Sequence, residues 1–289
     1  MAANVTLTDA NLQYTNFTVN RDVTLTVPSG TVLRCTGTFT NNGTIAVSPG
    51  AQGSDQCGSL SSMDTNYAPA MAGVSLRAAG IGEMGDNTTT RFAGFGGTGL
   101  STFQARQVLR PGIAAGGGGA ATHCVTGGDG GGSLVVLANA GLANNGTIHA
   151  DGAGGLTRAA GGGGGIVILA SLGLMTNPGT ITAVGGPGGA SDSFGGAGGG
   201  GGGGIIHFLA PSVNNTGTTN VAGGASGTAG AAGSVTANPR QGGSGGGATA
   251  GSGGFGGPVG GGAAGNPFPA SPGTAGLVLI DQLDPTSLF

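Results

Sequence analysis

The chain has 289 residues, of which 71 are glycine and 13 are proline, while only 7% are charged and the formal net charge is −3. All eight basic residues are arginine, so the chain has no basic stripe for nucleic acid and no lysine for a phosphate-binding P-loop. The longest apolar run, residues 166–175, is about half the ~20 residues of a membrane-spanning helix, and a 37% hydrophobic fraction with little charge argues against disorder.

Residues 1–75 hold few glycines and alternate polar with apolar residues, as in VTLTDANLQYTNFTVN from Val5. Such alternation predicts half-buried strands, and we interpret this part as the beginning of a β-solenoid. The first residues, MAANVTLTD, lack the charged and apolar regions of a cleaved secretory signal.

Residues 76–125 are irregular and hold four of the arginines. Ser101 and Gln104 have the spacing of a capping box, and Pro111-Gly112 is a stop signal, so one short helix is predicted between them. His123 and Cys124 precede Asp129, but with no other polar neighbours in the sequence we interpret them as loop residues and not as catalytic groups.

Residues 126–222 repeat one phrase three times: a glycine run, an apolar strand and a turn. The strands begin at Leu134, Ile166 and Ile205, a spacing typical of solenoid repeats. The turn follows as LANNGTI, MTNPGTI or VNNTGTT, and FTNNGTI at Phe39 is a fourth copy. Asn-Gly favours a tight turn, and Thr-Ile begins another strand. One such unit cannot bury its own apolar face, so the units must stack.

The glycine runs have two interpretations. They are flexible linkers, or they are extended polyglycine II helices, which pack closely because no Cβ intervenes. Each run opens directly into an apolar strand, which favours the second. Ordered glycine costs roughly 0.5–1 kcal/mol more than alanine, so dense hydrogen bonding in a large, close-packed assembly must offset it. The predicted core glycines are Gly161, Gly163, Gly165, Gly198, Gly201 and Gly204.

Residues 223–289 are a glycine-rich stretch that ends in one more strand, at 273–280, which includes Leu277 and Ile280. Both ends of the predicted solenoid are apolar, and a solenoid without polar caps tends to associate. We therefore expect head-to-tail polymerisation through these ends. The final LIDQLDPTSLF resembles the uncleaved C-terminal signals of one-step exporters, which implies an extracellular or cell-surface location.

No arrangement of residues indicates an enzyme. Asp129 and Asp151 lie in glycine turns that resemble calcium-binding repeats, but they do not recur in register, so a structural turn role is favoured and no cofactor is expected. His149 and His207 are interpreted as packing residues. The three cysteines allow a Cys35–Cys57 disulfide or inert buried thiols.

The NNGTI turns, glycine runs and IVIL-type strands resemble two groups of proteins over roughly residues 126–280. One is the glycine-rich subunits of bacterial extracellular nanofibrils, in which β-solenoid parts and polyglycine helices build a stiff, hydrophobic surface fibre. The other is the glycine-rich adhesins at the tips of phage long tail fibres, in which stacked polyglycine helices display receptor-binding loops. The likeness lies in composition and repeat style, so it assigns no functional residue.

We therefore expect an all-β repeat solenoid with packed polyglycine II helices and very little α-helix, in a structural protein whose partner is itself. It would form a stable extracellular filament, such as a surface or biofilm fibre, without nucleic acid, membrane span or cofactor. The alternative is a phage tip adhesin that binds a host receptor, although the aromatic residues are thinly spread. Ice binding is a third hypothesis, for which only Thr44, Thr147, Thr180 and Thr218 approach a regular array.

Overall fold

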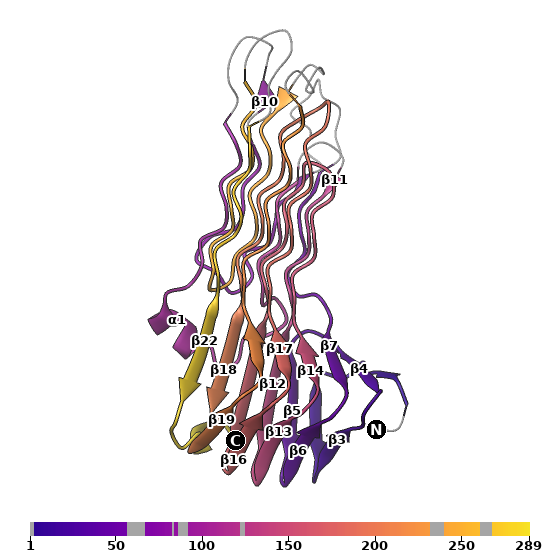
Figure 1. Ribbon diagram of the computed structural model, residues 1–289, viewed down its shortest axis with the longest axis vertical. Helices are drawn as coiled ribbons and strands as arrows, with labels where there is room; N and C mark the ends of the chain where they lie inside the picture. Colours follow the sequence, from indigo (N-terminus) through magenta and orange to yellow (C-terminus); the bar gives the residue numbers. More distant parts are fainter. Residues whose placement is uncertain are drawn as a thin grey trace.

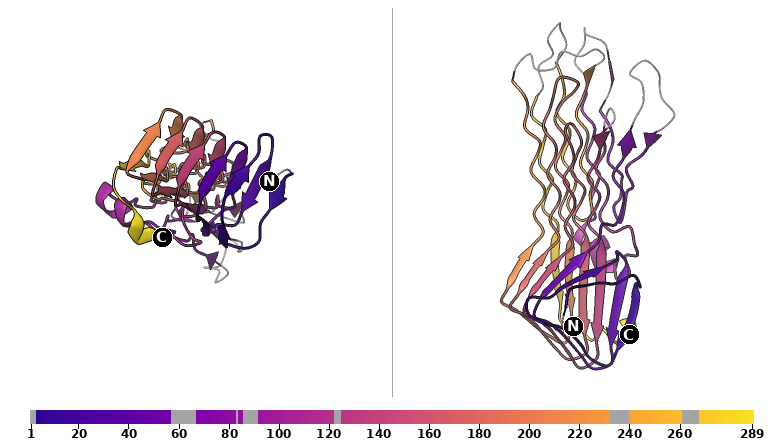
Figure 2. Two further views of the ribbon diagram at one scale, coloured as in Figure 1. Left: turned by 90° about the horizontal axis from the view of Figure 1, so that it is seen from below. Right: turned by 90° about the vertical axis from the view of Figure 1, so that its right-hand side faces the viewer.

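Two regions of different backbone geometry follow one another along the long axis of the molecule (Figure 1). The computed structural model describes residues 3–56, 67–82, 84–85, 92–121, 125–231, 240–260 and 268–289. At one end, parallel strands stack into a β-solenoid; at the other, extended glycine-rich segments run side by side and form what we call the shaft. The chain passes repeatedly between the two regions (Figure 2), so both draw on residues from the whole sequence.

Three parallel sheets form the solenoid, and each complete turn of the chain adds one strand to each sheet. Sheet A contains, in spatial order, β1 (Val5–Thr6), β4 (Thr24–Val27), β7 (Thr44–Val47), β14 (Thr147–His149), β17 (Thr180–Thr182) and β20 (Thr218–Asn220). Sheet B contains β2 (Asn11–Tyr14), β5 (Thr31–Cys35), β12 (Ser133–Ala138), β15 (Ile166–Ser171), β18 (Ile205–Leu209) and β22 (Leu277–Asp281). Sheet C contains β3 (Phe17–Val19), β6 (Thr38–Asn41), β13 (Gly141–Asn144), β16 (Leu174–Asn177) and β19 (Ser212–Asn215).

The four copies of the turn phrase occupy equivalent places, each joining a strand of sheet C to a strand of sheet A. In the second copy, Leu142 and Ile148 point inward and are buried. Each stacks in register on the corresponding residue of the next copy, Met175 and Ile181. The core of the solenoid is therefore a set of apolar columns that run across the strands. The predicted all-β repeat solenoid is confirmed.

The glycine runs are ordered parts of the shaft. In the run 198–204, every third N–H donates to the same neighbouring segment. Residues 198, 201 and 204 donate to the segment 183–189. Residues 199 and 202 donate to the segment 244–247, and residues 200 and 203 donate to the segment 271–274. The carbonyl groups of residues 198–203 accept from three other segments, 161–164, 224–227 and 251–254. Hydrogen bonds whose direction turns by one third of a revolution per residue are those of a polyglycine II helix packed among neighbouring helices.

The far part of the shaft carries short antiparallel pairings (Figure 1). The strands β8 (Asp55–Gln56), β9 (Tyr67–Ala68) and β11 (Val125–Thr126) form one small sheet, and β10 (Met84–Gly85) pairs with β21 (Arg240–Gln241). Hydrogen bonds of antiparallel strands thus link described segments of the shaft at the end remote from the solenoid.

A short helix covers the outer face of sheet B. The helix α1 (Thr102–Gln107) begins with the predicted capping box, in which Ser101 Oγ accepts from the Gln104 N–H and the Gln104 side chain accepts from the Ser101 N–H. Ala105 of α1 and Leu288 of the 3₁₀ helix η1 (Thr286–Leu288) pack against outward-facing apolar residues of sheet B. The strands β12, β15 and β18 of sheet B are therefore buried on both faces, which is why they read as continuous apolar runs.

A ladder of four asparagines, the first three of them buried, links four successive strands of sheet C. The Nδ2 of Asn41, Asn144 and Asn177 each donates to the Oδ1 of the next asparagine, 2.7 Å away, and the ladder ends at Asn215. Because each amide satisfies its neighbour, these polar groups are tolerated inside an otherwise apolar core.

We expect Asn177→Ala to lower the free energy of unfolding by about 2–3 kcal/mol, because it leaves the Asn144 donor and the Asn215 acceptor unpaired. The matched control is Asn145→Ala, which removes an exposed bond from Asn145 Nδ2 to Asn42 Oδ1 and should cost less than about 1 kcal/mol. Urea titration of both variants measures the difference. Equal losses would show that the buried ladder contributes no more than a surface pair.

Candidate functional site

The two ends of the solenoid leave their strand edges open. At one end, β1, β2 and β3 are the outermost strands of the three sheets, and at the other they are β20, β22 and β19. We call these the N-edge and the C-edge. No other described strand pairs with the outer side of any of the six. Open edges of parallel strands are ready to accept further strands.

The apolar core also reaches solvent at both edges. Leu33, Val136, Leu169 and Phe208 form one inward-facing column of sheet B, and all are buried. The register continues this column to Leu12 at the N-edge and to Ile280 at the C-edge. Ile280 is 43% exposed although its position faces the core, and Tyr14 beside Leu12 is 36% exposed. The core columns are thus uncapped.

The two residues that the sequence predicted for end-to-end contact lie on opposite faces of sheet B. Ile280 lies in the open core column of the C-edge, where the next rung of the solenoid would cover it. Leu277 faces the outside of sheet B, in register with Ile205, and packs against the cluster beneath α1. Leu12 and Tyr14 at the N-edge were not singled out by the sequence, although the strand NLQY has the alternation that marks them.

All six predicted core glycines are buried inside the shaft, in contact with neighbouring backbone. A Cβ on Gly161, Gly198, Gly201 or Gly204 would lie 1.9–2.0 Å from a carbonyl oxygen, well inside contact distance. On Gly165 it would lie 2.1 Å from the carbonyl oxygen of Gly132, and on Gly163 2.9 Å from the backbone of Ala248. These positions require glycine because the neighbouring helix occupies the side-chain space.

A polar network binds the C-edge strand to α1. His207 of β18 is buried on the outer face of sheet B, and its Nε2 lies 2.8 Å from Asp281 Oδ2. Asp281, in β22, also pairs with Arg106 of α1. The carboxylate accepts from Nε2–H, so the neutral imidazole carries its proton on Nε2. Burial first, and then the positive charge of Arg106, lower the pKa of His207 from 6.5 to about 4.

This network predicts a loss of stability in mild acid. The unfolded chain binds a proton at His207 near pH 6.5, whereas the folded chain does so near pH 4, so stability falls as the pH drops from 6.5 towards 4. Between pH 7.5 and 5.0 we expect His207 to account for about 2 kcal/mol. Urea unfolding at both pH values measures it, and His207→Phe should remove this part of the pH dependence. An unchanged dependence in that variant would contradict the assignment.

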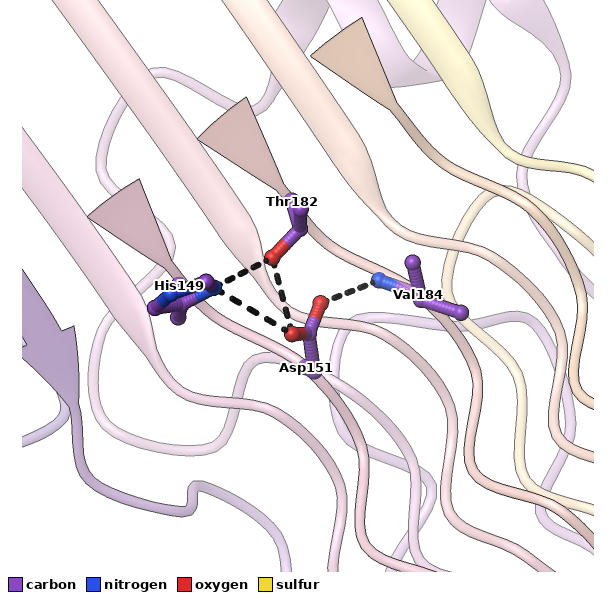
Figure 3. A network of polar contacts seen from close by, with 4 residues as sticks. All are labelled: His149, Asp151, Thr182 and Val184. Atoms are coloured by element: carbon purple, nitrogen blue, oxygen red, sulfur yellow. Dashed lines mark hydrogen bonds and ion pairs between the residues drawn. The ribbon is translucent and has the colours of Figure 1, made fainter. Parts of the chain in front are cut away.

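A second polar network lies on sheet A, at the strand ends that enter the shaft (Figure 3). Thr182 Oγ1 donates to Asp151 Oδ2 at 2.8 Å, and His149 Nδ1 lies 2.9 Å from the same hydroxyl. Because the only hydroxyl proton points to the carboxylate, Nδ1 of His149 must be the donor. Asp151 Oδ1 accepts from the Val184 N–H at 2.7 Å. The side chains of this network are all partly exposed. The network links one turn of the solenoid to the next by hydrogen bonds.

The other polar candidates of the sequence stay apart. Asp129 accepts from the N–H of Gly53, which belongs to the neighbouring turn on the N-edge side. Asp151 instead accepts from the N–H of Val184, which belongs to the neighbouring turn on the C-edge side. Within the described residues, no group of three potential metal-ligating side chains occurs. Cys35 is a free thiol and is not in a disulfide. It is buried, and this burial raises its pKa to about 11. Cys57, His123 and Cys124 lie outside the described residues.

The threonines considered for ice binding do align on the outer face of sheet A. Thr44, Thr147, Thr180 and Thr218 form one continuous column, which Thr24 extends toward the N-edge. The parallel column two residues further on holds Thr6, Thr26 and Thr182, but Ala46, His149 and Asn220 interrupt it. The face therefore carries one regular row of hydroxyl groups and one irregular row.

Comparison with protein-family models, with curated proteins and with solved structures gave no significant match. No helix in the described part of the chain is long and apolar enough to cross a membrane.

Proposed function

We propose that the protein is a structural subunit that assembles head-to-tail into an extracellular filament through its N-edge and C-edge. The observation that carries the proposal is the pair of open edges at opposite ends of one parallel solenoid. Such an interface joins two different surfaces, and heterologous contacts that do not close into a ring give open fibres.

The two edges are complementary in three respects. All paired strands of sheets A, B and C run parallel, so strands of a second copy can continue sheets A and B in the same direction. The exposed apolar side chains at both edges belong to the same core columns, with Ile280 opposite Leu12 of the next copy. Burying them removes apolar surface from water, at about 25 cal/mol per Å².

The incomplete turns at the two ends also fit together. At the N-edge the strand β1 of sheet A lies outside the first complete turn, and at the C-edge the strand β22 of sheet B lies outside the last one. Because they belong to different sheets, β22 of one copy and β1 of the next can occupy the same level of the solenoid without overlap. One copy then contributes six levels to the filament, at about 4.8 Å per level. Sheets A and B fill all six levels, whereas sheet C has five strands and leaves one level open between β19 and β3 of the next copy.

Negative-stain and cryo-electron microscopy of the purified protein test this proposal. We expect long, unbranched fibres with an axial repeat of roughly 29 Å, from six levels of 4.8 Å, and with shafts projecting sideways along the fibre. Discrete particles at every concentration would overturn the filament assignment. Fibres with an unrelated repeat would overturn stacking through these edges.

A second candidate, a tip adhesin, is favoured by one specific observation. Phe92, Phe255 and Phe268, which are 69%, 59% and 48% exposed, lie on three neighbouring helices of the shaft. Phe95 follows Phe92 by three residues, one turn of a polyglycine II helix, and its ring is contacted by Arg77 at 3.6 Å. Exposed aromatic groups are typical of binding surfaces.

The same microscopy separates the two candidates. An adhesin remains a discrete particle, and labelled protein binds to receptor-bearing cells in a way that Phe255→Ser weakens. A filament subunit polymerises, and Phe255→Ser leaves the axial repeat unchanged.

A further inference from the structure

A cavity of about 290 Å³ lies on the outer face of sheet B near the N-edge. Its floor comes from strands β2, β5 and β12, and the segment 109–112 and Leu288 of η1 form its walls. It is separate from the core columns that face into the solenoid. Its volume is close to the lower limit of roughly 300 Å³ for small-molecule sites.

Two arginines line this cavity, in a chain that has only eight. Arg34 projects from β5 in register with Leu137, and Arg110 precedes Pro111 in the covering segment. Among the described residues that line the cavity none is acidic, and no ion pair between described residues involves either arginine. The site therefore combines two positive charges without a counter-charge.

The remaining lining is mainly apolar, from Val32, Val135, Leu137 and Leu109, with the amide of Asn11 at the side. A guanidinium group presents paired N–H donors that match the two oxygens of a carboxylate. Apolar walls next to these donors favour a ligand with a hydrocarbon body and disfavour a fully hydrated inorganic anion.

We propose that this cavity binds a small organic carboxylate, with Arg34 and Arg110 on the carboxylate and the sheet B side chains around the apolar body. Val135 and Leu137 belong to a buried strand, and they give the ligand a rigid floor. The inference does not depend on filament formation, because every lining residue belongs to one chain.

Calorimetric titration of the whole protein with benzoate tests this site. We expect saturable binding of one benzoate per chain, with a Kd of about 1 mM for so small a ligand. Benzyl alcohol, which has the same ring without the charge, and inorganic phosphate, which has charge without a ring, should each bind at least about 10-fold more weakly.

Arg34→Gln and Arg110→Gln should each weaken benzoate binding at least about 10-fold, whereas Arg21→Gln, in an exposed turn and outside the cavity lining, should not change it. Benzyl alcohol or phosphate binding as tightly as benzoate, or no saturable binding to the wild type, would overturn the proposal. So would folded Arg34 and Arg110 variants with unchanged affinity. If either variant fails to fold, the comparison of benzoate, benzyl alcohol and phosphate binding to the wild-type protein still tests the proposal.

Discussion

The Ile280→Arg variant is expected to remain monomeric at concentrations at which the wild-type protein forms filaments. Ile280 lies in the open core column of the C-edge, 43% exposed, where a second copy would bury it. A charge buried there without a partner is strongly unfavourable. We expect the critical concentration for assembly to rise by more than about 100-fold, equivalent to about 3 kcal/mol. Sedimentation velocity over a concentration series measures it.

Two controls make this result specific. Leu174→Arg places the same charge at an exposed position of β16, an inner strand of sheet C whose two sides are both paired, and should assemble like the wild type. Leu12→Arg blocks the N-edge instead. Neither Ile280→Arg nor Leu12→Arg should polymerise alone, but a mixture should form dimers and nothing longer, because each retains one intact edge. Polymers in the mixture, or in either variant alone, would contradict head-to-tail stacking.

Replacing Gly201 with valine is expected to abolish folding of the shaft. A Cβ at this position would lie 2.0 Å from the carbonyl oxygen of Gly162 and 2.5 Å from its carbon. Those atoms belong to the backbone of a neighbouring helix that is itself bonded on several sides, so they cannot move aside. The expected loss exceeds about 4 kcal/mol. Thermal unfolding followed by circular dichroism, together with limited proteolysis, measures the effect.

The matched control is Gly141→Ala, at the surface of sheet C, where a Cβ would meet only the Leu174 carbonyl oxygen at 3.3 Å. It should change the melting temperature by only a few degrees. If the Gly201 variant melted like the wild type, the glycine run would be a spacer and not part of the packed shaft.

The solenoid was largely predictable because its signals are local and repeated. The NNGTI phrase carries its own turn and two inward-facing residues, so four copies define four stacked turns. The capping box at Ser101 likewise predicted α1 from four residues. The three bonding directions of the glycine run were not predictable, because a run of identical residues contains no information about which segments surround it.

The candidate sites were predictable only in part. Ile280 belongs to the terminal strand of a repeat, so the sequence points to it directly. Its counterpart Leu12 depends on register across the first turn, which repeats too weakly in the sequence to be recognised. The cavity beside Arg34 depends on the segment 109–112, whose path over sheet B follows from tertiary packing with Val135 and Leu137 and not from any local pattern.

The rotation of hydrogen-bond direction in the shaft restricts how its length can change in evolution. Inserting a single residue into the run 198–204 would turn every later N–H by a third of a revolution, away from its acceptor. Only insertions or deletions of three residues, about 9 Å of shaft, preserve the phase. Shafts in related chains should therefore differ in length by multiples of three residues in each arm.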